Sequence, residues 1–209
     1  MKSSPATKIY IAIGTAIVWF ALVLQFIVSL KAANYDFWTT TKLYLSFFTV
    51  TTNILLGICF GSVLLLSNHR IGKFFTKSST ITALTVYILV VGLIYNVLLR
   101  GLVLPVGWAR VADEMLHVVT PVIFLVFWIL FVDKSNLQYK DAFSWLIYPM
   151  AYIIFVVVRG YFIHEYPYPF VNVINLGYPQ AILNAFFCVL LFYVLSILLI
   201  WLGKKLHKN

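Results

Sequence analysis

The sequence has little charge for its length. Lys, Arg, Asp and Glu together make up 10% of the 209 residues, and only six residues are acidic, whereas 63% are hydrophobic. A soluble domain of this size does not need so much apolar surface. The apolar residues also form continuous runs of about 20 residues, the length of a membrane-spanning helix. The composition therefore leaves no room for a separate soluble domain and predicts a polytopic, all-α membrane protein.

Patterns that indicate disulfides, metal sites or nucleotide binding are also missing. The two cysteines, Cys59 and Cys188, both lie inside apolar runs, where we interpret them as small core residues. The histidines are far apart along the chain and do not form the ligand cluster of a buried zinc enzyme. The sequence has no GxSxG, P-loop or GxGxxG motif. We therefore expect no metal ion and no other cofactor.

Six apolar runs are long enough to cross a bilayer at about 1.5 Å per helical residue. They predict a single domain over residues 1–209, a six-helix bundle with spans at Ile9–Leu30, Leu43–Leu66, Ile81–Leu104, Ala112–Val132, Ala142–Ile163 and Tyr178–Gly203. The connection Tyr161–Gly177 is long, aromatic and contains two prolines that cannot continue a helix, so we expect it to fold back over the helix ends.

The basic residues predict the orientation of the bundle. An even number of spans puts both termini on one side, and all but five of the 15 Lys and Arg residues lie on that side; the five are Lys31, Lys42, Arg100, Arg110 and Arg159. Basic loops stay in the cytoplasm, so we expect cytoplasmic termini in a multi-pass protein of the cell membrane. The net charge of +9 then faces anionic lipid headgroups, and nucleic acid is not an expected partner.

Polar residues gather at one depth in the predicted bundle. Because alternate helices run in opposite directions, residues late in odd spans and early in even spans share a level, which we place roughly 5–18 Å below the outer surface. Every predicted span contributes to this layer, whose members are Gln25, Thr49, Asn53, Asn96, Arg100, Glu114, His117, Arg159 and Asn184. Such groups face the interior of a bundle, either to hold the helices together or to line a polar pocket. We favour the pocket.

This layer contains the groups needed to cleave an ester. His117 suits the role of a general base, and a threonine hydroxyl such as that of Thr49 becomes a nucleophile when a base takes its proton. Glu114, one turn before His117, is expected to orient the imidazole or its neighbours. An arginine or the Asn53 amide is expected to stabilise an oxyanion.

The two deep arginines need counter-charges. We expect Glu114 or Asp113 to pair with one of them, Arg100 or Arg159, and a bound carboxylate to pair with the other.

Several short motifs, in order along the chain, resemble a known family. They are LVLQF around Gln25, FFTVTTN at residues 47–53, MLHVVTP at residues 115–121, and an Arg-Gly pair followed by YPYPF. Together they resemble the six-helix bacterial relatives of the androgen-induced membrane protein family, often labelled Pr6Pr membrane proteins. Animal members of that family are threonine hydrolases that cleave fatty-acid esters of hydroxy fatty acids inside the membrane.

The resemblance implies roles for particular residues. The threonine after the aromatic pair corresponds to Thr49, although Thr51 and Thr52 in the same run are alternatives, and the histidine before a proline corresponds to His117. The YPF element corresponds to residues 168–170. The leading hypothesis is thus an intramembrane hydrolase that uses a Thr nucleophile and a His base on a lipid or fatty-acyl ester. The alternatives are a non-enzymatic binder or transporter of an amphipathic anion, and a structural subunit.

Overall fold

The computed structural model describes residues 4–66 and 68–208, and its secondary structure is helical apart from one isolated bridge between Arg100 and Val103. The elements in order are α1 (Pro5–Ala32), α2 (Phe37–Tyr44), α3 (Phe48–Leu65), α4 (Arg70–Phe75), α5 (Ser78–Ile94), η1 (Tyr95–Leu99), α6 (Trp108–Glu114), η2 (Met115–Val119), α7 (Thr120–Phe131), α8 (Asp141–Trp145), α9 (Ile147–Ile163), η3 (Pro169–Val171) and α10 (Val173–Lys208).

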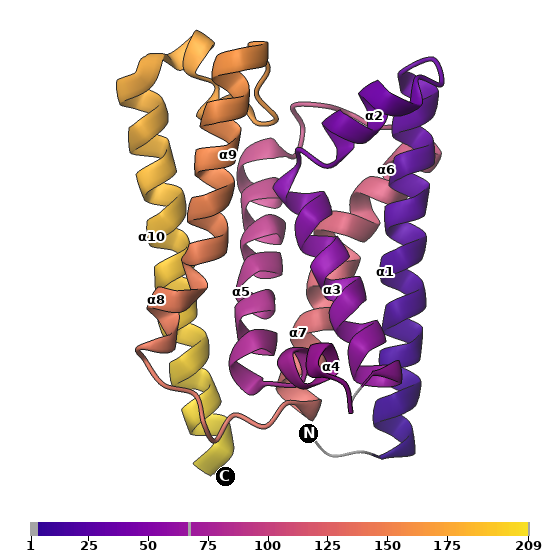
Figure 1. Cartoon of the computed structure of the whole chain (residues 1–209), viewed down its shortest axis with the longest axis vertical. Coiled ribbons are helices and arrows are strands. Elements are labelled where there is room, and N and C mark those ends of the chain that lie inside the picture. The colour runs from indigo at the N-terminus through magenta and orange to yellow at the C-terminus, as the bar shows by residue number, and fades with distance from the viewer. Residues whose placement is uncertain (1–3, 67, 209) are drawn as a thin grey trace.

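Six helical spans are long and apolar enough to cross a membrane. They are Pro5–Ala32, Phe48–Leu65, Ser78–Leu99, Trp108–Phe131, Asp141–Ile163 and Val173–Leu206. The predicted all-α, six-helix membrane bundle is therefore confirmed. The start of α1 and the end of α10 lie at the same end of the bundle (Figure 1).

The prediction of one continuous helix over Leu43–Leu66 is wrong. The chain forms two helices, because α2 ends at Tyr44 and α3 begins only at Phe48. The backbone of Phe47, the residue before α3, is extended, and its apolar side chain makes no capping hydrogen bond. Two tyrosine hydroxyls replace that cap: the backbone N–H of Phe48 donates to Tyr152, and that of Thr49 donates to Tyr168. The break thus places Thr49 in the first turn of a helix.

The third and fourth spans each contain a π-helical turn that the apolar pattern does not predict. The turn η1 ends the third span at Leu99, whereas the sequence predicted Leu104, and the Arg100 N–H donates to the Tyr95 carbonyl five residues back. The turn η2 joins α6 to α7 within the fourth span. Such turns insert an extra residue and are frequent at functional sites. In the sixth span, the backbone of Gly177 is left-handed and breaks the helix just before the predicted start at Tyr178.

The core lies between α1, α3, α5 and α7. Large aromatic side chains fill it: Phe60 contacts both Phe124 and Phe127 at ring-centroid distances of 5.0 Å, and all three are fully buried. Gly14 gives the Phe60 ring room against α1, and Gly57 does the same for Trp19 against α3. Small residues of this kind let membrane helices approach closely.

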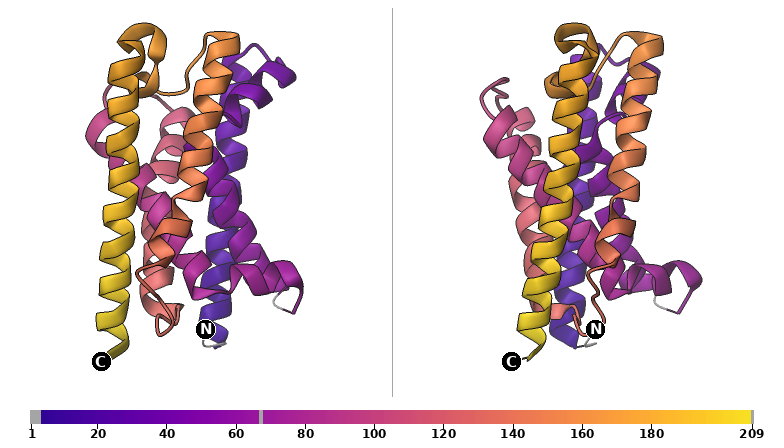
Figure 2. Two further views of the ribbon diagram at one scale, coloured as in Figure 1. Left: turned by 60° about the vertical axis from the view of Figure 1, so that its left-hand side comes forward. Right: turned by 90° about the vertical axis from the view of Figure 1, so that its left-hand side faces the viewer.

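Helices α9 and α10 form a peripheral hairpin. Only 17% and 22% of their most apolar windows are buried inside the protein, against 61% for the spans of α3 and α5. The pair stands at the left of the bundle in Figure 1 and faces the viewer in the right-hand view of Figure 2. The connection between α9 and α10 folds back as expected, because Tyr168 reaches the first turn of α3.

The contact between Gly14 and Phe60 yields a stability prediction. A Cβ atom at residue 14 would lie 2.8 Å from Cε2 of the buried Phe60 ring, so Gly14→Ala should destabilise the protein by about 1–3 kcal/mol. Gly61→Ala is the matched control, because a Cβ atom there meets nothing within 4 Å and alanine favours a helix by up to about 1 kcal/mol. Thermal unfolding of both variants in one detergent, followed by tryptophan fluorescence, measures the difference. An equal or higher melting temperature for Gly14→Ala would contradict this packing.

Candidate active site

The two π-helical turns bring Tyr95 and His117 face to face. The phenol ring of Tyr95 in η1 stacks on the imidazole of His117 in η2, with centroids 3.7 Å apart and planes inclined by 12°. The amide of Asn96 joins the same turns, because its Nδ2 donates to the carbonyls of Gly92 and His117. Gly92 permits this approach, since a Cβ atom there would lie 3.3 Å from the His117 carbonyl oxygen.

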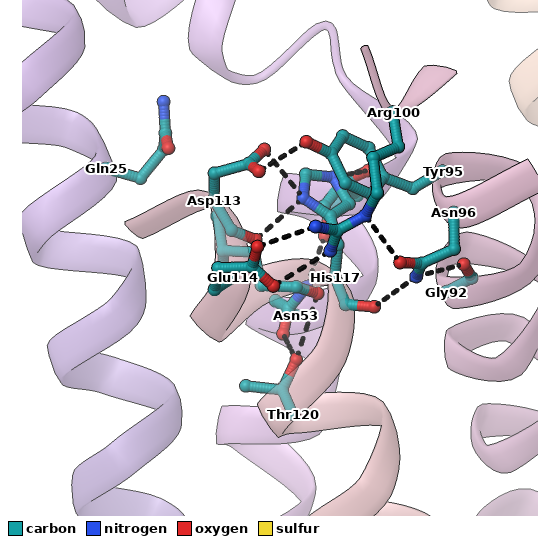
Figure 3. A network of polar contacts seen from close by, with 12 residues as sticks. Gln25, Asn53, Gly92, Tyr95, Asn96, Arg100, Asp113, Glu114, His117 and Thr120 are labelled. Atoms are coloured by element: carbon teal, nitrogen blue, oxygen red, sulfur yellow. Dashed lines mark hydrogen bonds and ion pairs between the residues drawn. The ribbon is translucent and has the colours of Figure 1, made fainter. Parts of the chain in front are cut away.

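Asp113 holds the other edge of the imidazole. The Nδ1 atom of His117 lies 2.9 Å from the Asp113 backbone carbonyl and 3.1 Å from its carboxylate Oδ1. A carbonyl oxygen only accepts hydrogen bonds, so Nδ1 carries a hydrogen and Nε2 of the neutral ring is left as an acceptor. The hydroxyl of Tyr95 donates to the second carboxylate oxygen, Oδ2. Tyr95 and Asp113 together fix both the tautomer and the plane of the ring (Figure 3).

The free nitrogen of His117 faces Thr49. The Nε2 atom lies 3.4 Å from the Thr49 hydroxyl, which is also 3.4 Å from the hydroxyl of Tyr168. Both contacts are at the long end of hydrogen bonding. The Thr49 side chain is buried, at 7% exposure for the residue. This arrangement permits transfer of the hydroxyl proton to the ring.

The two alternative threonines have different partners. Thr51 hydrogen-bonds to the carbonyls of its own helix turn and, at 2.8 Å, to the hydroxyl of Tyr148. Thr52 is fully buried and also contacts Tyr148, at 3.4 Å. Of the three hydroxyls, that of Thr49 is the one at hydrogen-bonding distance from His117.

Asp113, and not Glu114 as expected, contacts the imidazole of His117. Glu114 forms a two-pronged ion pair with Arg100, at 2.7 and 2.8 Å, and this pair is partly exposed, at 39% and 34% of the two side chains. The Nε atom of Arg100 donates to Asn96, and the guanidinium lies 5.4 Å from the Tyr95 ring centre. Glu114 thus neutralises Arg100, whereas Asp113 contacts the imidazole.

The Asn53 amide is not free to bind an oxyanion. Its Nδ2 donates to the Thr49 carbonyl at 2.8 Å, and its Oδ1 accepts from the Thr120 hydroxyl at 2.7 Å. The residue is fully buried, so these bonds link α3 to α7 below the candidate nucleophile. Asn53 and Arg100 thus both have protein partners, and the expected oxyanion role of an arginine or of the Asn53 amide stays a prediction.

Three further members of the predicted polar layer have partners away from His117. Gln25 donates to Ser29 on its own helix, and Figure 3 shows its amide apart from the network. Arg159 pairs with Glu165 at 3.6 Å and donates to its carbonyl, and Asn184 donates to the carbonyl of Phe170. Asn184 still supports the site indirectly, because Phe170 lies in the segment that carries Tyr168.

A cavity of about 430 Å³ opens beside Thr49. It lies between α3, α5 and η1 on one side and α9, η3 and α10 on the other. Tyr95, Tyr152 and Tyr168 contribute to its wall near Thr49, and the rest is mostly aliphatic and aromatic: Val90, Val91, Met150, Ile153, Val157, Ile182, Phe186, Val189 and Phe192. Within the described part of the chain, no residue lining this cavity carries a charge.

Tyr168 offers a hydrogen-bond donor at the cavity wall near Thr49. Its oxygen accepts from the Thr49 N–H at 3.3 Å, which leaves the phenolic hydrogen available to a nearby acceptor. Burial raises the pKa of this phenol above its ordinary value, so the hydroxyl stays protonated at neutral pH. Sequence reasoning from depth alone overlooked Tyr168, Tyr95 and Thr120, although the family motif included Tyr168.

Comparisons with protein-family models, with curated proteins and with solved structures return no match for this chain. The resemblance to the androgen-induced membrane protein family therefore stays a prediction, and the case for a function rests on the site geometry.

Proposed function

We propose that this protein is an intramembrane hydrolase of lipid esters, with Thr49 as the nucleophile and His117 as the general base. The observation that carries the proposal is the chain of contacts from Asp113 through His117 to Thr49, ending at an apolar cavity. Nucleophile, base and orienting carboxylate stand in the order of a hydrolytic triad. The cavity suits an acyl chain, since its volume lies in the range of about 300–1,000 Å³ typical of small-molecule sites.

The reaction has two balanced steps. First, Thr49 Oγ attacks the ester carbonyl while Nε2 of His117 takes its proton; the bond from carbonyl carbon to alkoxy oxygen then breaks, and the alcohol leaves with that proton. Second, water attacks the acyl-threonine ester, again giving a proton to His117, and the fatty acid and the Thr49 hydroxyl are released. The Tyr168 O–H and the N-terminal end of α3 favour the negative charge on the carbonyl oxygen in both steps.

The membrane setting is part of the proposal. We place the protein in the cell membrane with both termini in the cytoplasm, because most of its basic residues lie at the end of the bundle that carries the termini. The reacting groups then lie toward the non-cytoplasmic side, and the substrate is a lipid or fatty-acyl ester dissolved in the bilayer. A binder or transporter of an amphipathic anion would need an unpaired cation at the cavity, and the pairing of Arg100 and Arg159 counts against it.

Loss of the nucleophile tests the proposal directly. Thr49→Ala should abolish both labelling by a fluorophosphonate probe and hydrolysis of a fatty-acyl ester, a fall in kcat of about 10⁴-fold or more. His117→Ala should have a similar effect because the hydroxyl then lacks a base. Thr51→Ala is the matched control on the same helix, and we expect it to keep both activities. Unchanged labelling in both Thr49→Ala and His117→Ala would rule out this mechanism.

A second pair of variants tests which carboxylate orients His117. Asp113→Asn keeps the size of the side chain but removes its charge, so we expect kcat to fall about 10²–10⁴-fold with little change in KM. Glu114→Gln should leave kcat nearly unchanged and lower the free energy of unfolding by only about 0.2–1 kcal/mol, because its ion pair is partly exposed. Steady-state kinetics in detergent micelles compares the two. The reverse ranking would assign the orienting role to Glu114.

A further inference from the structure

We infer that the site selects esters whose cavity-bound part carries no ionised group, that is, neutral long-chain carboxylic esters. This inference rests on the proposed function and narrows its substrate class. It departs from the sequence-based expectation that an arginine holds a substrate carboxylate. Three features of the cavity and its surroundings support it.

The first feature is the cavity wall itself. In the described ranges its lining contains no Lys, Arg, His, Asp or Glu. The hydroxyls of two lining tyrosines are committed to protein acceptors: Tyr95 donates to the Asp113 carboxylate, and Tyr152 donates to the Ser46 carbonyl at 2.8 Å. These tyrosines therefore offer ring surface rather than hydrogen bonds. A carboxylate placed there would lose its water without gaining a counter-charge.

The second feature is the pairing of the charged side chains close to the cavity. Arg100 forms its ion pair with Glu114. The Nδ1 edge of His117 lies against the Asp113 carboxylate. Arg159, the other deep arginine, is held by Glu165 and does not line the cavity. Both deep arginines are thus already paired with protein carboxylates. An anionic group in the cavity would have to break one of these pairs to gain a counter-charge, whereas a neutral ester needs none.

The third feature is the position of the cavity between the well-packed helices and the peripheral hairpin. α9 and α10 form one wall, and most of their apolar surface faces outward from the protein, toward lipid. Exposed apolar residues of both helices also line the cavity, among them Ile154 of α9 and Ile182 and Phe186 of α10. An apolar wall of this kind suits a neutral ester, whereas an ionised lipid keeps its charged group at the membrane surface.

The test compares a lipid ester ending in a free carboxyl group with its own methyl ester, which differs by one methyl group and one charge. The probe is the methyl ester of a pyrene-labelled fatty acid. It binds to the Thr49→Ala protein at pH 8 in nanodiscs of phosphatidylcholine, a zwitterionic lipid with no net charge. We expect the methyl-ester competitor to displace this probe at a membrane concentration at least tenfold lower than the free acid. Lowering the pH until the acid is protonated should bring the two values together.

Two results would overturn the inference. One is equal or tighter binding of the free acid at pH 8. The other is a loss of free-acid affinity in the Thr49→Ala, Arg100→Gln protein, which would mean that Arg100 leaves Glu114 to bind the carboxylate. Because the Thr49→Ala protein is not expected to hydrolyse either ligand, this binding result stands apart from catalysis. Hydrolysis of the same methyl-capped ester by the unsubstituted protein tests the proposed function separately.

Discussion

The structure depends on one constraint: a polar atom inside an apolar bundle needs a partner in the protein. In the residues that the structure describes, each buried side-chain nitrogen or oxygen has such a partner. Isolated hydroxyls meet this requirement locally, as when Thr85 and Ser196 donate to carbonyls four residues back. A buried amide needs more than one partner: Asn53 donates to the carbonyl four residues back and also accepts from Thr120 on another helix. Charged groups need a counter-charge as well. The network around His117 results from that necessity and also positions its ring.

The apolar pattern of the sequence is sufficient to predict the fold class and the six spans, because long hydrophobic runs have few other solutions. Counting residues from the span ends also puts Thr49 and His117 at one depth, and the structure brings their side chains to 3.4 Å. That success depends only on depth in the membrane. Each residue of a helix adds a fixed rise, so the residue number gives the distance along the membrane normal. It does not depend on knowing which helices are neighbours.

The face of the helix on which each side chain lies could not be predicted in the same way, because it depends on rotation about the helix axis. Spacing of three residues puts Glu114 and His117 on one stripe of a regular α-helix, but η2 adds a residue to the turn and changes which side chains align. Asp113, four residues before His117, makes the contact instead. The break before Phe48 was equally hidden, since no proline or glycine marks it and the tyrosines that replace its cap are about a hundred residues away.

His117 lies at the boundary between two environments, and its position explains how one small bundle can contain both a cluster of charged side chains and an apolar cavity. Asp113, Glu114 and Arg100 lie on its Nδ1 side, where they largely neutralise one another and are partly exposed. Thr49 and the apolar cavity lie on its Nε2 side. The flat ring of Tyr95 belongs to both, because its hydroxyl binds Asp113 while its ring lines the cavity. In the proposed reaction Nε2 takes the proton of Thr49 on the cavity side, while the carboxylate that stabilises the resulting imidazolium stays on the opposite side of the ring.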